Sequence, residues 1–154
     1  MIVLVLFLGM FLLGTMGCTT PPKKEGFTVK LVGMEEQNRG NPVVLRWYQL
    51  KKRENFERVD YQDFRKDDDK LLGADLVEWK ETTMYPGTKK TLDLQVYTGE
   101  GVEYLGVAAF FEDPQGSSWR QVISIKDRDF CQEPWFSDLK VILNEGQILL
   151  ETRC

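Results

Sequence analysis

Short stretches that alternate between apolar and polar residues recur from residue 27 to the end of the chain. This period of two is typical of strands that bury one face, and turn residues separate most of the stretches. In Tyr85-Pro86-Gly87-Thr88, proline presets one backbone angle of a turn and glycine accepts the positive one. Glu145-Gly146 resembles the two-residue loop of a hairpin. The expected strands are 27–31, 43–50, 76–83, 91–97, 103–111, 119–126, 138–143 and 147–153.

These short strands do not alternate regularly with helices, which argues against a parallel βαβ sheet. The sequence therefore predicts an all-β domain over residues 27–154, built as a two-sheet antiparallel β-sandwich. Segment 43–50, with the sequence VVLRWYQL, carries apolar residues on both of its sides. Either side of this strand could therefore face the core.

Residues of about 52–75 differ from the rest of the domain because they are highly charged. Phe56, Val59 and Phe64 have roughly helical spacing, which predicts one or two short helices, with Asp60 as the N-cap of the second. The acidic run 67–69 lacks the alternating oxygen ligands, central glycine and distal glutamate of a known calcium loop. We therefore expect a solvated acidic turn there, within a small helical insertion.

The first 17 residues contain no charged side chain and end in a glycine that is followed by Cys18. The run is short for a membrane span, which needs about 20 apolar residues, and it is typical of a secretion signal. Gly17-Cys18 resembles the lipobox of bacterial lipoproteins, which predicts a signal peptide over 1–17 and lipidation of Cys18. Residues 18–26 would then form a lipidated, flexible tether. A plain cleaved signal and an uncleaved anchor are the alternatives.

Charge and composition exclude several kinds of function. The net charge of −4 argues against nucleic acid as a partner, because nucleic acid requires a basic face. The chain has no histidine, which removes the commonest general base, most zinc sites and every Ser-His or Cys-His pair. We therefore expect no enzymatic activity, no metal and no cofactor.

Cys131 and Cys154 remain once Cys18 is assigned to lipid. Behind an export signal, such a pair favours a disulfide over a metal or catalytic site. If Glu145-Gly146 forms a two-residue hairpin loop, Cys154 lies across from Ser137, and Cys131 is in the connection that enters that strand. Two free thiols, or a bond from Cys154 to another chain, are the alternatives.

Several segments, taken in the order in which they occur, resemble those of a known protein family. They are Arg39 to Leu50 (RGNPVVLRWYQL), Phe56, Asp60-Tyr61, Leu72 to Leu76 (LGADL), Tyr85-Pro86-Gly87 and Tyr104 to Phe110 (YLGVAAF). Their order and spacing resemble the TssJ family, also called SciN or VasD. These proteins are outer-membrane lipoproteins of the bacterial type VI secretion system. The resemblance covers most of the chain, from Cys18 to about Ile125.

The resemblance implies a transthyretin-like β-sandwich that anchors the secretion apparatus at the periplasmic face of the outer membrane. Thr19 agrees with this location, because Asp directly after the acylated cysteine retains a lipoprotein at the inner membrane. The implied partner is the periplasmic C-terminal domain of TssM, an inner-membrane protein, with a TssL-like protein in the same complex.

In the family, the loop between the first two strands contributes to the contact with TssM, and here that loop is 33–42. Asn38, Gly40 and Pro42 match the family's loop pattern. The charged insertion around residues 55–69 could extend the contact. The candidate partner-binding residues are Glu36, Gln37, Asn38, Arg39, Gly40, Asn41 and Pro42.

Two other classes of protein are alternatives to an assembly protein. A periplasmic enzyme such as a cell-wall hydrolase lacks a histidine, and the acidic residues sit mainly in charged runs. A periplasmic lipoprotein binding module or inhibitor of another lineage could share the sandwich fold. In that case Trp119, Trp135 and Phe136 could form a sugar-binding platform, against the simpler expectation that they pack in the core or at an edge.

Overall fold

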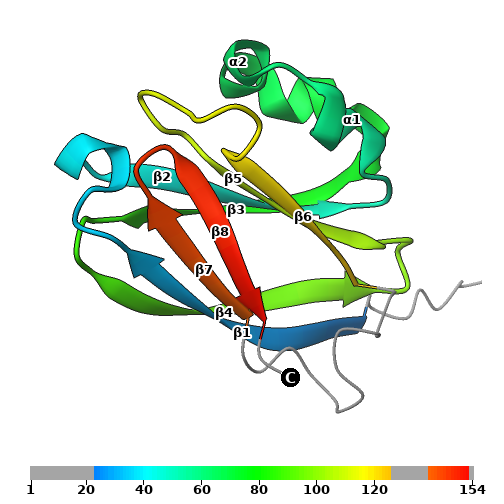
Figure 1. Ribbon diagram of the computed structural model, residues 1–154. Helices are drawn as coiled ribbons and strands as arrows, with labels where there is room; N and C mark the ends of the chain where they lie inside the picture. The colour runs from blue at the N-terminus through cyan, green and yellow to red at the C-terminus, as the bar shows by residue number, and fades with distance from the viewer. Residues whose placement is uncertain (1–22, 126–138, 153–154) are drawn as a thin grey trace, which may run out of the picture.

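The computed structural model describes residues 23–125 and 139–152. Within these residues, eight strands form two four-stranded sheets that pack face to face (Figure 1). The first sheet has the order β4 (Lys89–Thr98), β1 (Lys23–Gly33), β7 (Leu139–Asn144) and β8 (Gln147–Thr152). The second has the order β3 (Leu76–Met84), β2 (Val43–Leu50), β5 (Tyr104–Ala109) and β6 (Arg120–Ser124). The predicted sandwich is therefore confirmed.

One strand pairing differs from the predicted antiparallel arrangement. β1 and β7 are parallel, with Val29 opposite Leu139, whereas the other paired strands are antiparallel. Parallel neighbours need a long connection, and here the whole second sheet lies between them in the sequence. The absence of a βαβ pattern therefore did not exclude a parallel pair.

Strand β1 also begins earlier than expected. Its first residue, Lys23, pairs with Thr98 of β4, so residues 23–26, which were expected in the flexible tether, form strand. Ladder hydrogen bonds join backbone groups and require no apolar side chain. The polar composition of this segment therefore concealed the strand. The tether's other residues, with Cys18, and the pair Cys131 and Cys154 lie outside the described residues.

Strand β2 is the centre of the core and is buried on both of its faces. Trp47 lies between the sheets and is 1% exposed. On the opposite face Tyr48 packs against the aromatic rings of Phe56 and Phe64, with centroid distances of 5.5 Å in both cases. The apolar pattern on both sides of β2 thus has a structural reason, because one side meets the first sheet and the other meets the helical insertion.

The insertion forms two helices, α1 (Glu54–Arg58) and α2 (Tyr61–Leu72), which cover the outer face of the second sheet (Figure 1). Asp60 caps α2 as predicted, because its Oδ1 accepts a hydrogen bond of 2.9 Å from the backbone N–H of Gln62. A short 3₁₀ turn, η2 (Gly73–Asp75), then leads into β3. No helix in the described part of the chain is long and apolar enough to cross a membrane.

One prediction about the insertion needs correction, and one expectation about its neighbour Trp119 is confirmed. The acidic run 67–69 lies within α2, which kinks at Asp67, and not in a turn between elements. Asp67 and Asp69 are exposed as expected, but Asp68 is 7% exposed. Trp119 is 2% exposed and packs against Tyr61 and Phe64, so it belongs to the core as expected, and the alternative role in a sugar platform is excluded for it. Trp135 and Phe136, the other two residues of that platform, lie outside the described residues.

Candidate interaction site

Four connections meet at one end of the sandwich (Figure 1). They are the β1–β2 loop with the 3₁₀ turn η1 (Gln37–Gly40), the β3–β4 turn, the β5–β6 loop and the Glu145-Gly146 turn of the β7–β8 hairpin. The backbone N–H of Met34 donates to Leu143 O at 2.9 Å, and that of Gln115 donates to Gly146 O at 2.9 Å. The connections are therefore bonded into one surface.

Asn38 holds the β1–β2 loop to two of its neighbours. Its backbone N–H donates to Glu145 O at 2.6 Å, and its side-chain Oδ1 accepts from the backbone N–H of Glu112 at 2.7 Å. Its Nδ2 donates to Pro42 O at 2.9 Å and so closes the loop on itself. With an exposed fraction of 5%, Asn38 acts as a scaffold residue at the base of this surface.

Gln37 ties the same loop to β3. Its side chain is fully buried and donates from Nε2 to Met84 O at 3.0 Å. A Cβ atom added at Gly33 would lie 2.6 Å from Tyr85 O and would also meet Gln37 Oε1, so only glycine fits at that position. Gln37 and Asn38, both predicted to contact a partner, are thus buried parts of the fold.

The exposed part of the predicted set is Glu36, Arg39, Gly40, Asn41 and Pro42. Asn38, Arg39 and Gly40 have φ values of 46°, 56° and 79°, three left-handed residues in succession. Asparagine and glycine tolerate this conformation better than most residues, which agrees with the sequence of the loop. The left-handed run reverses the chain and brings residues 39–42 to the surface.

Arg39 crosses to the β5–β6 loop. Its Nη2 lies 2.6 Å from Asp113 Oδ2, and the two side chains are 68% and 69% exposed. An ion pair this exposed contributes little to folding stability. Both groups are therefore available to exchange this bond for one with a partner.

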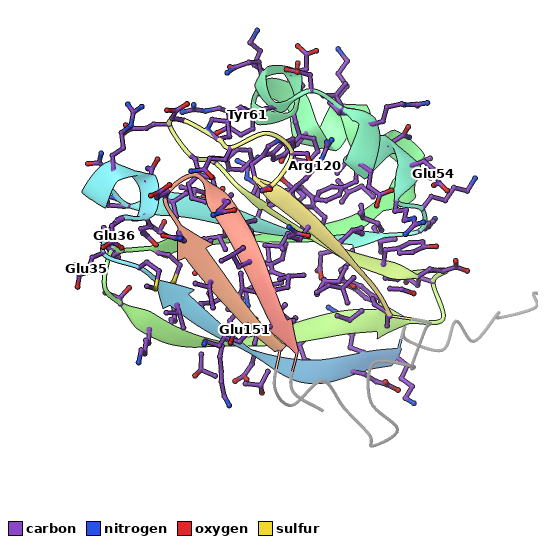
Figure 2. The ribbon with its side chains drawn as sticks, in the orientation of Figure 1. Glu35, Glu36, Glu54, Tyr61, Arg120 and Glu151 are labelled. Carbon is purple, nitrogen blue, oxygen red and sulfur yellow. The ribbon has the colours of Figure 1, made fainter. Side chains whose placement is uncertain are left out.

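The surface as a whole is acidic. Its five exposed carboxylates outnumber its exposed cations, Arg39 and Lys89, and Met34 and Tyr85 add apolar area with exposed fractions of 41% and 58%. Figure 2 shows two of the carboxylates, Glu35 and Glu36, close together beside η1. A negative field of this kind favours and orients a basic partner. The exposed acidic residues are Glu35, Glu36, Glu112, Asp113 and Glu145.

The helical insertion is attached to the β5–β6 region beside this surface. Tyr61 donates a hydrogen bond from its hydroxyl to Phe111 O, and Arg120 donates to the carbonyls of Phe56 at 2.7 Å, Val59 at 2.6 Å and Glu57 (Figure 2). Burial lowers the pKa of Arg120 and outweighs nearby carboxylates that raise it. The predicted extension of the contact over residues 55–69 thus borders the loop surface.

A partly buried charge pair also fixes the insertion, and the sequence did not reveal it. Arg46 Nη1 lies 2.7 Å from Asp68 Oδ2, which also accepts a hydrogen bond from the Tyr48 hydroxyl. Burial raises the pKa of Tyr48, and its hydrogen bond to Asp68 raises it further. Burial lowers the pKa of Arg46, but its bonds to Asp68 and Glu81 outweigh this and raise it overall. The only signal in the sequence was an arginine inside an apolar strand.

The site has the features of a binding surface. In the described ranges, no three carboxylate or cysteine side chains gather closely enough to hold a metal ion. The exposed charges of the loops lie at one end of the sandwich and are joined to its core by the bonds described above. Such an arrangement can carry contacts to another protein at little cost to the fold.

Comparison with known proteins identifies related chains. Residues 29–146, more than half of the chain, match the T6SS-SciN family, described as "Type VI secretion lipoprotein, VasD, EvfM, TssJ". No curated protein matches the chain significantly.

Three solved structures have a similar fold. The lipoprotein TssJ1 of Pseudomonas aeruginosa is 26% identical over 87% of this chain and 98% of its own, with a TM-score of 0.68. Serratia marcescens Lip, described as a membrane-bound component of the type VI secretion system, is 18% identical over 84% and 98%, with a TM-score of 0.71. A chain of the structure described as "T6SS protein TssM C-terminal domain (869-1107) from EAEC" is 23% identical over 85% and 100%, with a TM-score of 0.66.

Proposed function

This chain belongs to the T6SS-SciN family of type VI secretion lipoproteins, and on that premise we propose that it is an outer-membrane anchor of the type VI secretion membrane complex. In this role it binds the periplasmic C-terminal domain of a TssM-like inner-membrane protein, with a TssL-like protein in the same complex. The function is structural rather than enzymatic.

The observation that carries this proposal is the direction of strand β1. The strand has 11 residues, which span about 36 Å, and it runs from Lys23 at one end of the sandwich to Gly33 at the loop end (Figure 1). Cys18, the proposed lipid attachment site, precedes Lys23 by only a few residues. A lipid on Cys18 therefore holds the opposite end of the sandwich at the membrane and leaves the acidic loop end facing the periplasm.

The loop end has what a docking surface for a periplasmic domain requires. Its backbone is fixed by bonds among the connections, so little loop entropy is lost on binding. Its exposed side chains are charged and flank the apolar side chains of Met34 and Tyr85. We therefore assign the TssM contact to Glu36 and residues 39–42, together with the neighbouring acidic residues of the β5–β6 loop.

The direct test is a calorimetric titration with the periplasmic C-terminal domain of the TssM protein from the same organism. The core residues run from Val29 to Ile148, so a chain that begins at residue 19 retains the whole described core. We expect saturable binding whose affinity falls as salt is raised, because the surface is charged. Absence of binding by a folded chain, checked by circular dichroism, would refute the proposed partner.

A further inference from the structure

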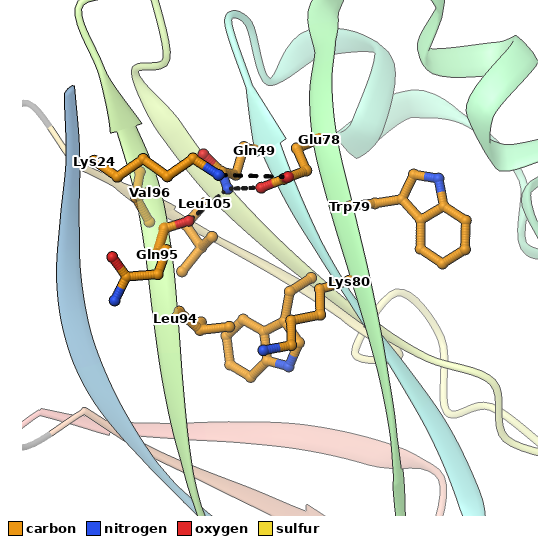
Figure 3. A pocket seen from close by; sticks show the side chains of 10 residues that line it. Lys24, Gln49, Glu78, Trp79, Lys80, Leu94, Gln95, Val96 and Leu105 are labelled. Atoms are coloured by element: carbon orange, nitrogen blue, oxygen red, sulfur yellow. Dashed lines mark hydrogen bonds and ion pairs between the residues drawn. The ribbon is translucent and has the colours of Figure 1, made fainter. Parts of the chain in front are cut away.

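The two long sides of the sandwich differ from each other. On the β6–β8 side the sheets are joined, because the backbone N–H of Ile148 donates to Ser118 O at 2.7 Å and Gln121 Nε2 donates to Ile148 O at 3.2 Å. On the β3–β4 side a pocket of about 240 Å³ lies between the sheets (Figure 3). The second side is therefore the one with room for a ligand.

One wall of the pocket carries inward-facing charges on the edge strand β3. Lys80 pairs with Trp47 of β2, and Glu78 pairs with Gln49. Residues directly opposite one another in an antiparallel pair share a face, so Lys80 and Glu78 face the same side as Trp47. Figure 3 shows Lys80 on the pocket side of β3, whereas Trp79 points away from the pocket.

Both carboxylate oxygens of Glu78 already have partners within the pocket. Its Oε2 accepts a hydrogen bond of 2.9 Å from Gln49 Nε2, and its Oε1 lies 3.9 Å from Lys24 Nζ. The side-chain amide of Gln49 is also satisfied. Its nitrogen donates a second hydrogen bond to Gln95 O at 2.8 Å, and its oxygen accepts one from the backbone N–H of Tyr97 at 2.8 Å. This end of the pocket therefore needs no further partner.

At the other end of the pocket, one buried donor has no acceptor among the described residues, and an exposed lysine lies beside it. The indole Nε1–H of Trp47 is buried and has no hydrogen-bond partner in the part of the chain that the structure describes. Lys80, across from it in the ladder, is exposed and forms no ion pair with any described residue. Native proteins pair nearly all buried polar groups. An inward-facing lysine can also protect an edge strand from pairing, but that role explains only Lys80 and not the indole.

The other walls and the charge of the pocket define the ligand. Leu94 and Leu105, which are 4% and 2% exposed, contribute apolar surface from the two sheets. With Lys24, Lys80 and Glu78 the pocket is positive, although the chain carries a net charge of −4. A water molecule occupies about 30 Å³ of liquid, so the pocket has room for roughly eight non-hydrogen atoms.

We propose that this pocket binds a small monocarboxylate with a short alkyl chain. The carboxylate accepts hydrogen bonds from the Trp47 indole and the Lys80 ammonium group, and the alkyl chain packs against Leu94 and Leu105. Movement of the exposed Lys80 side chain gives the carboxylate access to the indole. The site lies on the long side of the sandwich, away from the loop end, and is independent of the TssM contact.

Hexanoate, which has a size close to that of the pocket, is the probe for this proposal. In ¹⁵N-labelled protein, titration with hexanoate is expected to shift the Trp47 indole N–H resonance in a saturable way. The resonance is assigned by its loss in Trp47→Phe. Hexanol, which lacks the charge, is expected to bind about tenfold more weakly, because a charge-assisted hydrogen bond is lost. Absence of a saturable shift with hexanoate overturns the proposal, and equal binding of hexanol overturns the carboxylate assignment.

A pair of lysine variants locates the site. Lys80→Gln removes the charge on an exposed side chain and is expected to weaken hexanoate binding about tenfold with no change in melting temperature. Lys66→Gln, on the exposed face of α2, is the matched control and is expected to bind as the unmodified protein does. Equal affinities for the two variants would place the binding elsewhere and overturn the assignment to this pocket.

Discussion

Arg46 of β2 and Asp68 of α2 form an ion pair of 2.7 Å that joins the helical insertion to the centre of the second sheet. The Asp68 side chain is 9% exposed and that of Arg46 is 26% exposed. The guanidinium also binds Glu81 at 2.8 Å and lies 4.7 Å from the ring centre of Trp79. One arginine thus connects the insertion, β2 and β3.

Removal of Asp68 should therefore destabilise the domain. Asp68→Ala leaves Arg46 and the Tyr48 hydroxyl without their shared acceptor, and a broken buried pair costs about 3–5 kcal/mol. Arg46 is partly exposed and keeps Glu81, so we expect a smaller loss, about 2–3 kcal/mol. Urea unfolding measures this loss in the free energy of unfolding. The matched control is Asp69→Ala, on an exposed neighbour, for which about 0.5 kcal/mol or less is expected. Equal losses for the two variants would show that the pair contributes nothing specific.

Stability should also fall at alkaline pH. Burial, followed by the hydrogen bond to Asp68, raises the pKa of Tyr48 above its ordinary value of about 10. Above that value the unfolded chain loses the phenol proton while the folded chain keeps it, so unfolding becomes easier as pH rises. One such group gives a slope of about 1.4 kcal/mol per pH unit.

Tyr48→Phe removes this phenol and should reduce the slope above pH 10 by up to that amount. Tyr61, whose pKa is raised by burial, retains its own contribution. The measurement is the free energy of unfolding in urea at several pH values between about 8 and 11. An unchanged slope in Tyr48→Phe would contradict the assignment.

Local patterns in the sequence predicted much of this fold. The period of two located the strands, and the chemistry of Asp60 and of Glu145-Gly146 located a helix start and a hairpin turn, which the structure confirms. Each of these features depends on residues a few positions apart. The residues whose burial was predicted wrongly have hydrogen-bond partners that are distant in the sequence.

Gln37 and Asn38 illustrate the limit in the candidate site. Both were expected at the surface because the loop is polar, yet Gln37 binds a carbonyl 47 residues away and Asn38 binds an N–H 74 residues away. Such contacts follow from the packing of the sheets and leave no local pattern. Glu36 and residues 39–42 are exposed as expected, since the left-handed turn that exposes them is encoded by neighbouring residues.

The acidic loop surface gives a third prediction. Glu36→Lys reverses one exposed charge of that surface and should weaken binding to the TssM periplasmic domain about tenfold at low salt, without a change in melting temperature. Calorimetric titration measures the affinity. Glu100→Lys is the control, because it makes the same reversal in the β4–β5 connection, at the other end of the sandwich. Equal affinities in the two variants would move the contact away from the loops.

Lipid attachment at Cys18 gives a fourth prediction. Burial of acyl chains contributes about 0.8 kcal/mol per CH₂, and two chains already anchor a protein stably. Cys18→Ser should therefore leave a soluble or unprocessed protein and abolish type VI secretion. Membrane fractionation and a secretion assay measure this. A variant that still sediments with the outer membrane and supports secretion would refute lipid anchoring.

The last prediction is a disulfide between Cys131 and Cys154. Strands β7 and β8 pair with Asn144 opposite Gln147 and Leu139 opposite Thr152, which is the register expected of a two-residue hairpin loop. If this register continues, Cys154 faces Ser137, within reach of a chain that bends after Cys131.

Such a bridge would stabilise the domain by about 3 kcal/mol, chiefly because it restricts the unfolded chain, and it would hold the C-terminus against fraying. Protein purified without reductant should show no titratable thiol at Cys131 or Cys154 after denaturation and should migrate as a monomer. Cys131→Ser and Cys154→Ser should lower stability equally, since each removes the same bond. Two free thiols per chain would refute the bridge. A dimer that dissociates on addition of reductant would indicate a disulfide between chains instead.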